Sequence, residues 1–258
     1  MPRLAILIPS RTQPRQGAFL KQALASIRAQ TRFSAVEIDV IIAIDKDEKP
    51  PADFPGDPIA RFINSHTNSL AGALNAAAAA ADCDYMSILE DDDQWHPNYL
   101  ELAFETLKLA PFVSATQIEA DENNYIIRIQ DFCTPTSWTM ERRVWDKIGG
   151  FNERYRLHQD NEWLGRLGDS DVPRMHMVEC TAPVIPQVIM ETRPLLANVL
   201  RNAGPNFKLA RHHLPLPLVL RMLHVTSLTG QIGAEKAYAD RSAEEKKWLI
   251  EQFGRLPC

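Results

Sequence analysis

The stretch YMSILEDDDQWHP, residues 85–97, carries an apolar run that leads directly into four consecutive acids. Tyr85–Leu89 has the length and apolar character of a buried strand. The acids Glu90–Asp93 follow it without a break, and Trp95 and Pro97 close the segment. In open α/β sheets, ligands bind outside the carboxyl ends of the strands. The stretch therefore predicts a strand of such a sheet, with an acidic turn at its end.

On both sides of this stretch the chain alternates between strand-like and helix-like patterns. The expected strands are Leu4–Ile8, Val36–Ile44 and Tyr85–Leu89, and the expected helices are residues 18–29, Asn68–Ala81 and a segment that starts near Tyr99. Strands that alternate with helices predict right-handed βαβ units around a mostly parallel sheet. We therefore expect an α/β fold with helices flanking the sheet.

Polar residues follow the other predicted strands as well. Pro9, Ser10 and Arg11 come after the first strand, and Asp45 ends the second. Because the carboxyl ends of parallel strands lie on one rim, these residues are expected to converge with Glu90–Asp93. Asp45 is either a turn residue or a hydrogen-bond partner of a ribose or base. Arg11 is either a surface charge or a phosphate contact, and the sequence alone does not separate the two.

The later part of the chain is more mixed. We expect a hairpin from Ala115–Glu119 and Tyr125–Ile129, helices over Arg142–Ile148 and Asn161–Leu167, and a largely helical stretch from about Pro194 to the end. The predicted division is a catalytic domain over residues 1–190, with halves 1–110 and 111–190, and a helical C-terminal extension over 191–258.

Composition limits the class of protein. The chain has 258 residues, of which 45% are hydrophobic and 24% charged, as is usual for a soluble globular protein. Its net charge of −5 argues against nucleic acid as a partner, because phosphate repulsion would be unopposed over a broad surface. Four widely spaced cysteines and the absence of a signal-peptide pattern favour a reducing, cytoplasmic location.

One apolar run in the C-terminal part has two interpretations. Leu214–Leu223 is preceded by Arg201, Lys208 and Arg211, is interrupted by Arg221, and is too short to cross a bilayer. It is either a helix packed on the catalytic domain or a peripheral contact at the inner face of a membrane.

The acid run also has two interpretations. Mg²⁺ and Mn²⁺ prefer oxygen ligands and often take only one or two carboxylates, with substrate phosphates completing the shell. The alternative is a solvated acidic turn that caps the following helix. The position of Glu90–Asp93 at the end of an apolar strand favours the metal.

Asp160 is the candidate general base. It lies in His158-Gln159-Asp160, at the start of a predicted helix. A helix N-cap is the plain structural role for an Asp at such a place, whereas a carboxylate that takes a proton from an acceptor hydroxyl is the functional one. His158 is a competing base.

Taken in order, these segments resemble a family 2 glycosyltransferase with the GT-A fold. The resemblance covers roughly residues 3–170 and is carried by Leu4–Ser10, Val36–Asp45, Asn68–Asn75, Tyr85–Asp93, Gly149-Gly150-Phe151 and Gln159–Arg166. Four residues in three of these segments depart from the family pattern. Ser69 and Leu70 stand near the usual glycine, Glu90 replaces the first Asp of the metal motif, and Gln159 replaces a Glu before the base.

The resemblance implies a GT-A, Rossmann-like sheet and transfer of a sugar from a nucleoside-diphosphate-sugar, UDP- or GDP-linked, to an acceptor hydroxyl, with inversion at the anomeric carbon. The implied cofactor is Mn²⁺ or Mg²⁺, held by Glu90, Asp92 and Asp93. Asp92 is taken as the surest ligand, and a pairing of Asp91 with Asp93 is the alternative to Glu90 with Asp92. The implied base is Asp160. The implied donor residues are Pro9, Ser10, Arg11, Asp45, Asn68, Asn75 and Asp91. The acceptor-side residues are Trp138, His158 and Arg166, with Thr139 and Met140 as further wall residues. For Trp138, Thr139 and Met140, packing in the core is the alternative.

Two other functions remain open at this point. A nucleotide-sugar-binding protein without activity is compatible with the changes at Glu90 and Gln159. A sugar nucleotidyltransferase is less favoured, because its phosphate loop is glycine-rich and residues 9–17 contain one glycine.

Overall fold

A computed structural model describes residues 1–11, 16–51, 58–123, 125–179, 199–212, 217–225 and 227–258. Its main layer is an eight-stranded sheet of order β11-β10-β6-β9-β4-β1-β2-β3. The strands are β1 (Arg3–Ser10), β2 (Glu37–Ile44), β3 (Ala60–Asn64), β4 (Tyr85–Ile88), β6 (Phe112–Ala115), β9 (Thr139–Glu141), β10 (Arg174–Glu179) and β11 (Phe207–His212). The neighbouring pairs are parallel except those of β9, which runs antiparallel to β4 and β6. The predicted α/β fold with a mostly parallel sheet is confirmed.

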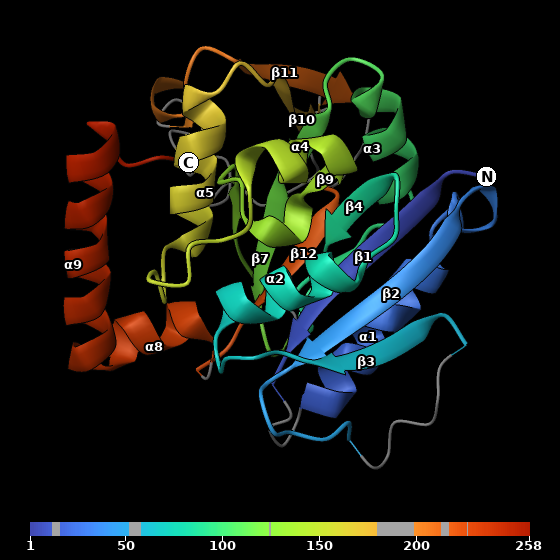
Figure 1. Cartoon of the computed structure of the whole chain (residues 1–258), viewed down its shortest axis with the longest axis horizontal. Helices are drawn as coiled ribbons and strands as arrows, with labels where there is room; N and C mark the ends of the chain where they lie inside the picture. Colours follow the sequence, from blue (N-terminus) through green and yellow to red (C-terminus); the bar gives the residue numbers. More distant parts are fainter. Residues whose placement is uncertain (12–15, 52–57, 124, 180–198, 213–216, 226) are drawn as a thin grey trace.

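Helices cover both faces of this sheet (Figure 1). They are α1 (Gln16–Arg28), α2 (Leu70–Ala80), α3 (Tyr99–Leu107), α4 (Arg142–Ile148) and α5 (Gln159–Asp169). Two further helices, α8 (Leu228–Ala234) and α9 (Lys236–Phe253), lie to one side of the sheet, where α9 contacts α5 (Figure 1). Side chains of β1 alternate between the two resulting cores. Leu4, Ile6 and Ile8 pack with α1 and α3, whereas Ala5 and Leu7 pack with α2, α4 and α5. Burial on both faces explains why this strand appears in the sequence as a continuous apolar run.

The edge strand β3 had no counterpart among the predicted strands. It pairs in parallel with β2 through residues such as Phe62 and Ile63. Its residues are exposed or only partly buried, as is usual at a sheet edge. An edge strand that buries little apolar surface leaves only a weak period-2 signal.

A smaller, four-stranded sheet has the order β5-β12-β7-β8. Its strands are β5 (Gln94–Trp95), β7 (Gln117–Asp121), β8 (Ile126–Gln130) and β12 (Val219–Leu223). The antiparallel pair of β7 and β8 confirms the predicted hairpin. β12 comes from the C-terminal part of the chain, yet it lies between β5 and β7. It therefore joins the acidic turn to the hairpin.

The C-terminal part is helical at its end, as expected, through α8 and α9. The prediction of helix is wrong for 207–212 and 219–223, which form β11 and β12. A short apolar run with arginine inside it cannot be assigned to helix or strand by periodicity alone. The predicted boundary at residue 190 lies outside the described residues.

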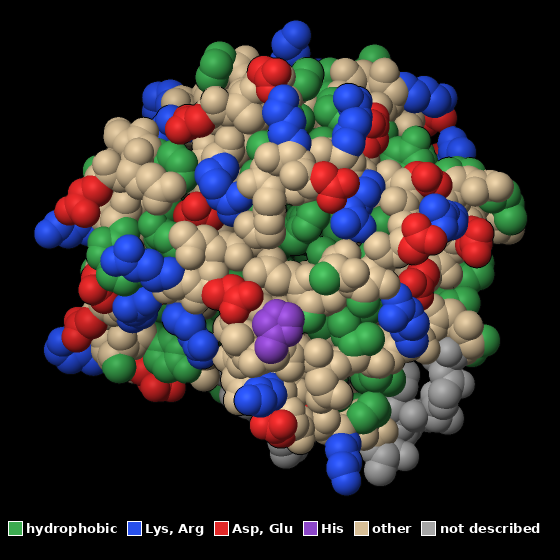
Figure 2. Space-filling model, in the orientation of Figure 1, with side chains coloured by type: hydrophobic (Ala, Val, Ile, Leu, Met, Phe, Trp, Pro, Cys, Tyr) green, Lys and Arg blue, Asp and Glu red, His purple; other side chains and the backbone are tan. Residues whose placement is uncertain are grey.

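The membrane interpretation of Leu214–Leu223 fails for its described residues. Leu218, Val219 and Met222 are buried within the protein, at 4%, 1% and 5% exposure, so their side chains do not face a membrane. Residues 214–216 lie outside the described part. Among the described helices, none is both long and apolar enough to span a membrane. Acidic and basic side chains alternate over the face drawn in Figure 2, including the part formed by α9.

Candidate active site

A pocket of about 720 Å³ lies at the carboxyl ends of β1, β2 and β4. The predicted site residues that line it are Pro9, Ser10, Arg11, Asp45, Asn68, Glu90, Asp91, Asp92, His158 and Asp160. The convergence expected from the parallel sheet is therefore present. Residues from 221 onward form another part of the wall, and these had not been predicted as site residues.

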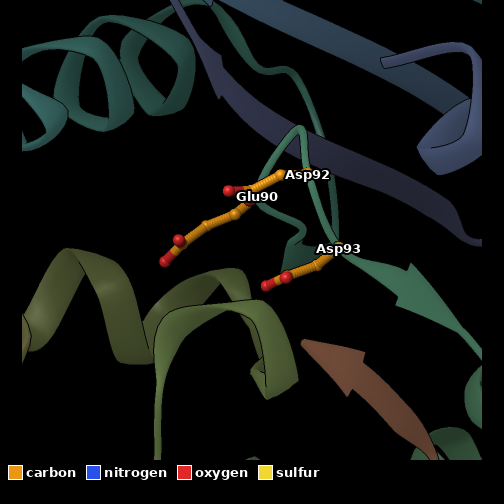
Figure 3. Close-up of side chains that lie close together, drawn as sticks. All are labelled: Glu90, Asp92 and Asp93. Atoms are coloured by element: carbon orange, nitrogen blue, oxygen red, sulfur yellow. The ribbon is translucent and has the colours of Figure 1, made fainter. Parts of the chain in front are cut away.

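Of the four acids after β4, three lie close together and the fourth binds elsewhere. One carboxylate oxygen from each of Glu90, Asp92 and Asp93 lies within 4.8 Å of the others, and the three side chains extend to the same side of the turn (Figure 3). The carboxylate of Asp91 instead accepts a hydrogen bond of 2.5 Å from the hydroxyl of Ser10. Asp91 therefore ties β1 to the turn, while the other three form one acidic cluster.

Burial makes this cluster costly to ionise. Burial and the charge of Asp92 raise the pKa of Glu90 to about 7, an effect that Arg221 opposes. Burial, with the charges of Asp92 and Glu90, raises the pKa of Asp93 well above its usual value. Oδ1 of Asp93 accepts a 2.8 Å bond from the backbone N–H of Met222, while its Oδ2 has no partner among the described residues. Asp93 is buried and Glu90 and Asp92 are half-buried. Carboxylates that repel one another in such surroundings, with an unused oxygen, fit a divalent cation.

His224 is a site residue that sequence reasoning missed. Its Nε2 lies 2.8 Å from Oδ2 of Asp92, and its ring stacks on Phe19 with a centroid distance of 5.4 Å. Gly230 allows this arrangement, because a side chain there would meet the carbonyl oxygen of His224 at 2.3 Å. No motif surrounds His224 in the sequence; its role depends on how β12 enters the small sheet.

Arg221 is a second such residue. It was noted only as a charge beside an apolar run, but it lies in β12 and lines the pocket. Its guanidinium donates 2.7 Å and 2.9 Å bonds to Glu119 and Thr229. Nearby acids, Glu90 and Asp93 first among them, raise its pKa against the effect of burial. Arg221 therefore keeps a positive charge beside the acidic cluster.

The turn after β2 forms the part of the pocket predicted to hold the nucleoside. Asn68 accepts a 3.0 Å bond from the backbone N–H of Lys46, and Asn64 donates to the carbonyl of Asp45 at 3.2 Å. Burial, followed by the charge of Glu48, raises the pKa of Asp45. These bonds hold the Asp45 side chain at the rim of the pocket.

Asp160 is the second residue of α5 and lines the same pocket. Its Oδ1 is buried and has no hydrogen-bond partner among the described residues. Burial raises the pKa of this carboxyl group, and the nearby guanidinium of Arg221 is among the groups that oppose the shift. A buried carboxylate with a raised pKa and one unused oxygen is suited to accept a proton.

His158 lines the pocket, but both of its ring nitrogens have partners. Nδ1 lies 3.0 Å from Oδ1 of Asn161, and Nε2 lies 2.8 Å from the hydroxyl of Ser242. The amide nitrogen of Asn161 donates to the carbonyl of Pro257 at 2.6 Å, which places the acceptor oxygen of Asn161 toward the histidine. Nδ1 of His158 is then the donor and Nε2 the acceptor. Its lone pair is used, so His158 is a poor base.

Three predicted acceptor-wall residues belong to the core instead. Trp138, Thr139 and Met140 are all 0% exposed. The ring of Trp138 packs against Trp163 and Phe112, with centroids 4.9 Å and 5.5 Å away. The prediction that Trp138 faces an acceptor is wrong, because large aromatic side chains at strand ends more often fill the core.

Asn75 and Arg166 also lie away from the pocket lining. Asn75 makes two bonds to the backbone of Phe151, accepting from its N–H at 2.7 Å and donating to its carbonyl at 2.9 Å. Arg166 binds Glu162 at 2.9 Å and the carbonyl of Gly150 at 2.8 Å. Both residues fasten the loop before α5, which corrects their predicted contacts with donor and acceptor.

Comparison with known families identifies the chain. The model of the family described as "Glycosyl transferase family 2" matches residues 5–160, more than half of the 258 residues. The chain belongs to glycosyl transferase family 2. A search of curated proteins by sequence finds no significant match.

Solved structures of TarS from S. aureus share the fold of this family 2 chain. The 1–349 fragment in complex with UDP gives a TM-score of 0.54 at 10% identity and covers 98% of this chain and 72% of that one. The same fragment in complex with UDP-GlcNAc gives 0.51 at 10% identity, covering 98% and 73%. A longer TarS chain gives 0.51 at 10% identity, covering 98% and 44%. The chain spans 53% of the 1–349 fragment in another match and 44% of the longer TarS chain. The expected GT-A fold is confirmed.

Proposed function

We propose that this chain transfers a sugar from a nucleoside-diphosphate-sugar to an acceptor hydroxyl, with inversion at the anomeric carbon. The observation that carries the proposal is that Glu90 and Asp92 of the acidic cluster line the same pocket as Asp160. Asp160 is close enough that its charge adds to the effect of burial and of Asp92 on the pKa of Glu90. Family membership supplies the reaction class.

The acidic cluster Glu90, Asp92 and Asp93 would hold Mn²⁺ or Mg²⁺. Three carboxylates within 4.8 Å, raised pKa values and the unused Oδ2 of Asp93 support this assignment. When bound, a divalent cation supplies positive charge that stabilises a departing diphosphate. Arg221 adds a fixed charge on the same side of the pocket.

Asp160 would act as the base. The hydroxyl of the acceptor loses its proton to Oδ1 of Asp160 while its oxygen bonds to the anomeric carbon, and the bond from that carbon to the diphosphate breaks. The raised pKa of Asp160 makes it a stronger proton acceptor than an exposed aspartate. The two bonds of the His158 ring favour Asp160 over His158 for this role.

The donor would lie along Ser10, Asp45 and Asn68 at the ends of β1 and β2. A uridine donor is the first to test, since the matching TarS fragment is described in complexes with UDP and with UDP-GlcNAc. A GDP-linked donor is the alternative within the same proposal.

The test is a panel of UDP- and GDP-sugars, beginning with UDP-GlcNAc, with and without Mn²⁺. Release of the nucleoside diphosphate measures turnover, and a thermal shift measures binding. We expect one nucleotide class to raise Tm only with the cation and its sugar to be consumed. Stabilisation without turnover for every sugar would instead favour a binding protein, and no stabilisation would reject the donor site.

A further inference from the structure

The C-terminal helix α9 lies beside the segment that leads into Asp160 (Figure 1). The family match ends at residue 160, whereas α9 spans Lys236–Phe253. Arg241, Ser242 and Lys246 of this helix line the pocket together with Asp160. The helix is therefore part of the site, although nothing in the family motifs refers to it.

Glu245 makes the main contact. Its side chain is 0% exposed, and its carboxylate accepts three consecutive backbone N–H groups. Oε1 accepts from Arg156 at 2.8 Å, and Oε2 accepts from Leu157 and His158 at 3.0 Å each. Nε of Arg241 donates to Oε1 at 2.7 Å. A buried charge is costly, and four donors offset that cost only while this geometry is kept.

These bonds lie at the start of α5, where no side-chain cap is present among the described residues of the helix. His158 is the N-cap of α5, but its side chain makes no capping bond. The carboxylate of Glu245 accepts the N–H of His158, two residues ahead of Asp160, and the two N–H groups before it. The orientation of the Asp160 side chain in the first turn of α5 thus depends on the position in which Glu245 holds the backbone of residues 156–158.

Further contacts from α9 hold the same segment. Nη2 of Arg241 donates to the carbonyl of Arg154 at 2.9 Å, and Ser242 binds the ring of His158. The ring of Trp248 lies 4.2 Å from the guanidinium of Arg154 and 4.7 Å from that of Arg241. Gly165 lets α5 approach this region, because a side chain there would meet the ring of Phe253 at 2.5 Å.

We propose that Glu245 is a positioning residue: through the backbone of residues 156–158 it sets Asp160 for proton transfer. The inference rests on the proposed role of Asp160 as base. Glu245 does not line the pocket, so it acts without touching substrate. Residues 5–160 alone would then contain the motifs of the family, but Asp160 would lack the contact from α9 that positions it.

The informative variant is Glu245→Gln in the full chain. It keeps the size of the side chain, but one acceptor oxygen becomes an amide that cannot accept, and the ion pair with Arg241 is lost. We expect kcat to fall about 10- to 100-fold, since small misplacement of a reacting group costs that much. The KM of the donor and the affinity for UDP with Mn²⁺ should change less than about twofold, because the donor residues lie on β1, β2 and β4.

Two further variants complete the comparison. Glu245→Asp keeps the charge and should recover part of kcat. If Glu245→Gln does not fold, the kcat of Glu245→Asp is compared with that of the parent chain instead. Glu244→Gln makes the same charge change on the neighbouring residue, whose side chain is 51% exposed and pairs only with Arg241 among the described residues. It should leave kcat and KM unchanged.

The effect should depend on Asp160. In an Asp160→Asn background, Glu245→Gln should reduce the residual turnover less than about twofold, because the group it positions is already lost. A full, additive loss in that background would overturn the proposal. So would a fall in donor affinity equal to the fall in kcat, which would mark a general structural role.

Hydrogen exchange separates this proposal from the proposed function. Amides 156–158 should exchange faster in Glu245→Gln than in the parent chain, with no change in α2. Unchanged protection would overturn the positioning role, whichever donor is used. If instead Asp160→Asn keeps full turnover while the amides lose protection, the assignment of the base fails and the contact of Glu245 stands.

Discussion

Nε2 of His224 lies 2.8 Å from Oδ2 of Asp92, although the two residues are 132 positions apart in the chain. β12 makes this contact possible, because it enters the small sheet between β5 and β7 and ends just before His224. The acidic cluster therefore depends on a residue from the C-terminal part of the chain. An imidazole at this distance orients the carboxylate of Asp92.

Replacing His224 by Ala should weaken metal-dependent nucleotide binding. Partners that orient a ligand typically contribute about 10- to 100-fold to metal affinity. Titration of UDP at several Mn²⁺ concentrations would give the change. His66→Ala, at an exposed position outside the pocket lining, is the control and should bind like the parent chain. Equal Mn²⁺ dependence in the two variants would contradict the role of His224.

The division of the acid run predicts different outcomes for Asp92→Asn and Asp91→Asn. Asp92 belongs to the acidic cluster, whereas Asp91 binds Ser10. We expect the Asp92 variant to lose most of the gain in UDP affinity that Mn²⁺ provides, and the Asp91 variant to retain it. Isothermal titration with and without Mn²⁺ measures both. The opposite pattern would show that Asp91 with Asp93 is the ligand pair.

Glu90 should give the metal-free protein a distinct pH dependence. Its pKa rises from 4.5 to about 7 on folding, so between these values the folded chain holds a proton that the unfolded chain has released. Stability then falls as pH rises through this window, by at most about 1.4 kcal/mol per pH unit. Urea unfolding at pH 5, 6, 7 and 8 with a chelator should show a steeper fall for the parent chain than for Glu90→Gln.

A control for that measurement is Glu101→Gln, which removes an exposed acid on α3. It should unfold with the same pH dependence as the parent chain. If Glu90→Gln also shows the same dependence of the free energy of unfolding on pH as the parent chain, the folded protein does not raise the pKa of Glu90.

Asn75→Ala should act on stability and turnover, not on nucleotide binding. It leaves the backbone N–H and carbonyl of Phe151 without their partner, a loss of about 1–3 kcal/mol. Chemical denaturation should detect this loss, and the Kd of UDP with Mn²⁺ should stay within about twofold. Asn152→Ala, at an exposed position of the same loop, is the control. A large loss of UDP affinity in Asn75→Ala would restore its predicted role as a donor residue.

Several features could be predicted because they have local causes. β1, β2 and β4 are buried on both faces, so they appear as apolar runs, and the polar residues at their ends follow from the parallel sheet. Ser10, Asp45, Glu90, Asp91 and Asp92 were placed at the pocket in this way, whereas Asp93 lies behind its lining. The position of Asp160 followed from the resemblance to the family.

Other features depend on contacts between distant segments. β12 could not be distinguished from a helix until its partners β5 and β7 were known, and His224, Arg221 and Glu245 acquire their roles only through that packing. Trp138 failed as an acceptor residue for a related reason. An aromatic side chain near a strand end fits a pocket wall or a core equally well in the sequence, and here three other aromatic rings surround it.

The central claim is that Asp160 takes the proton of the acceptor hydroxyl, while other residues of the same pocket, at the ends of β1, β2 and β4, bind the donor. The most direct measurement is turnover of a nucleotide-sugar by Asp160→Asn, made beside the affinity for the nucleoside diphosphate with Mn²⁺. We predict a loss of turnover of about 10²- to 10⁴-fold with nearly unchanged affinity, whereas Asp169→Asn, at the other end of α5, should behave like the parent chain. Turnover by Asp160→Asn equal to that of the parent chain would contradict the account.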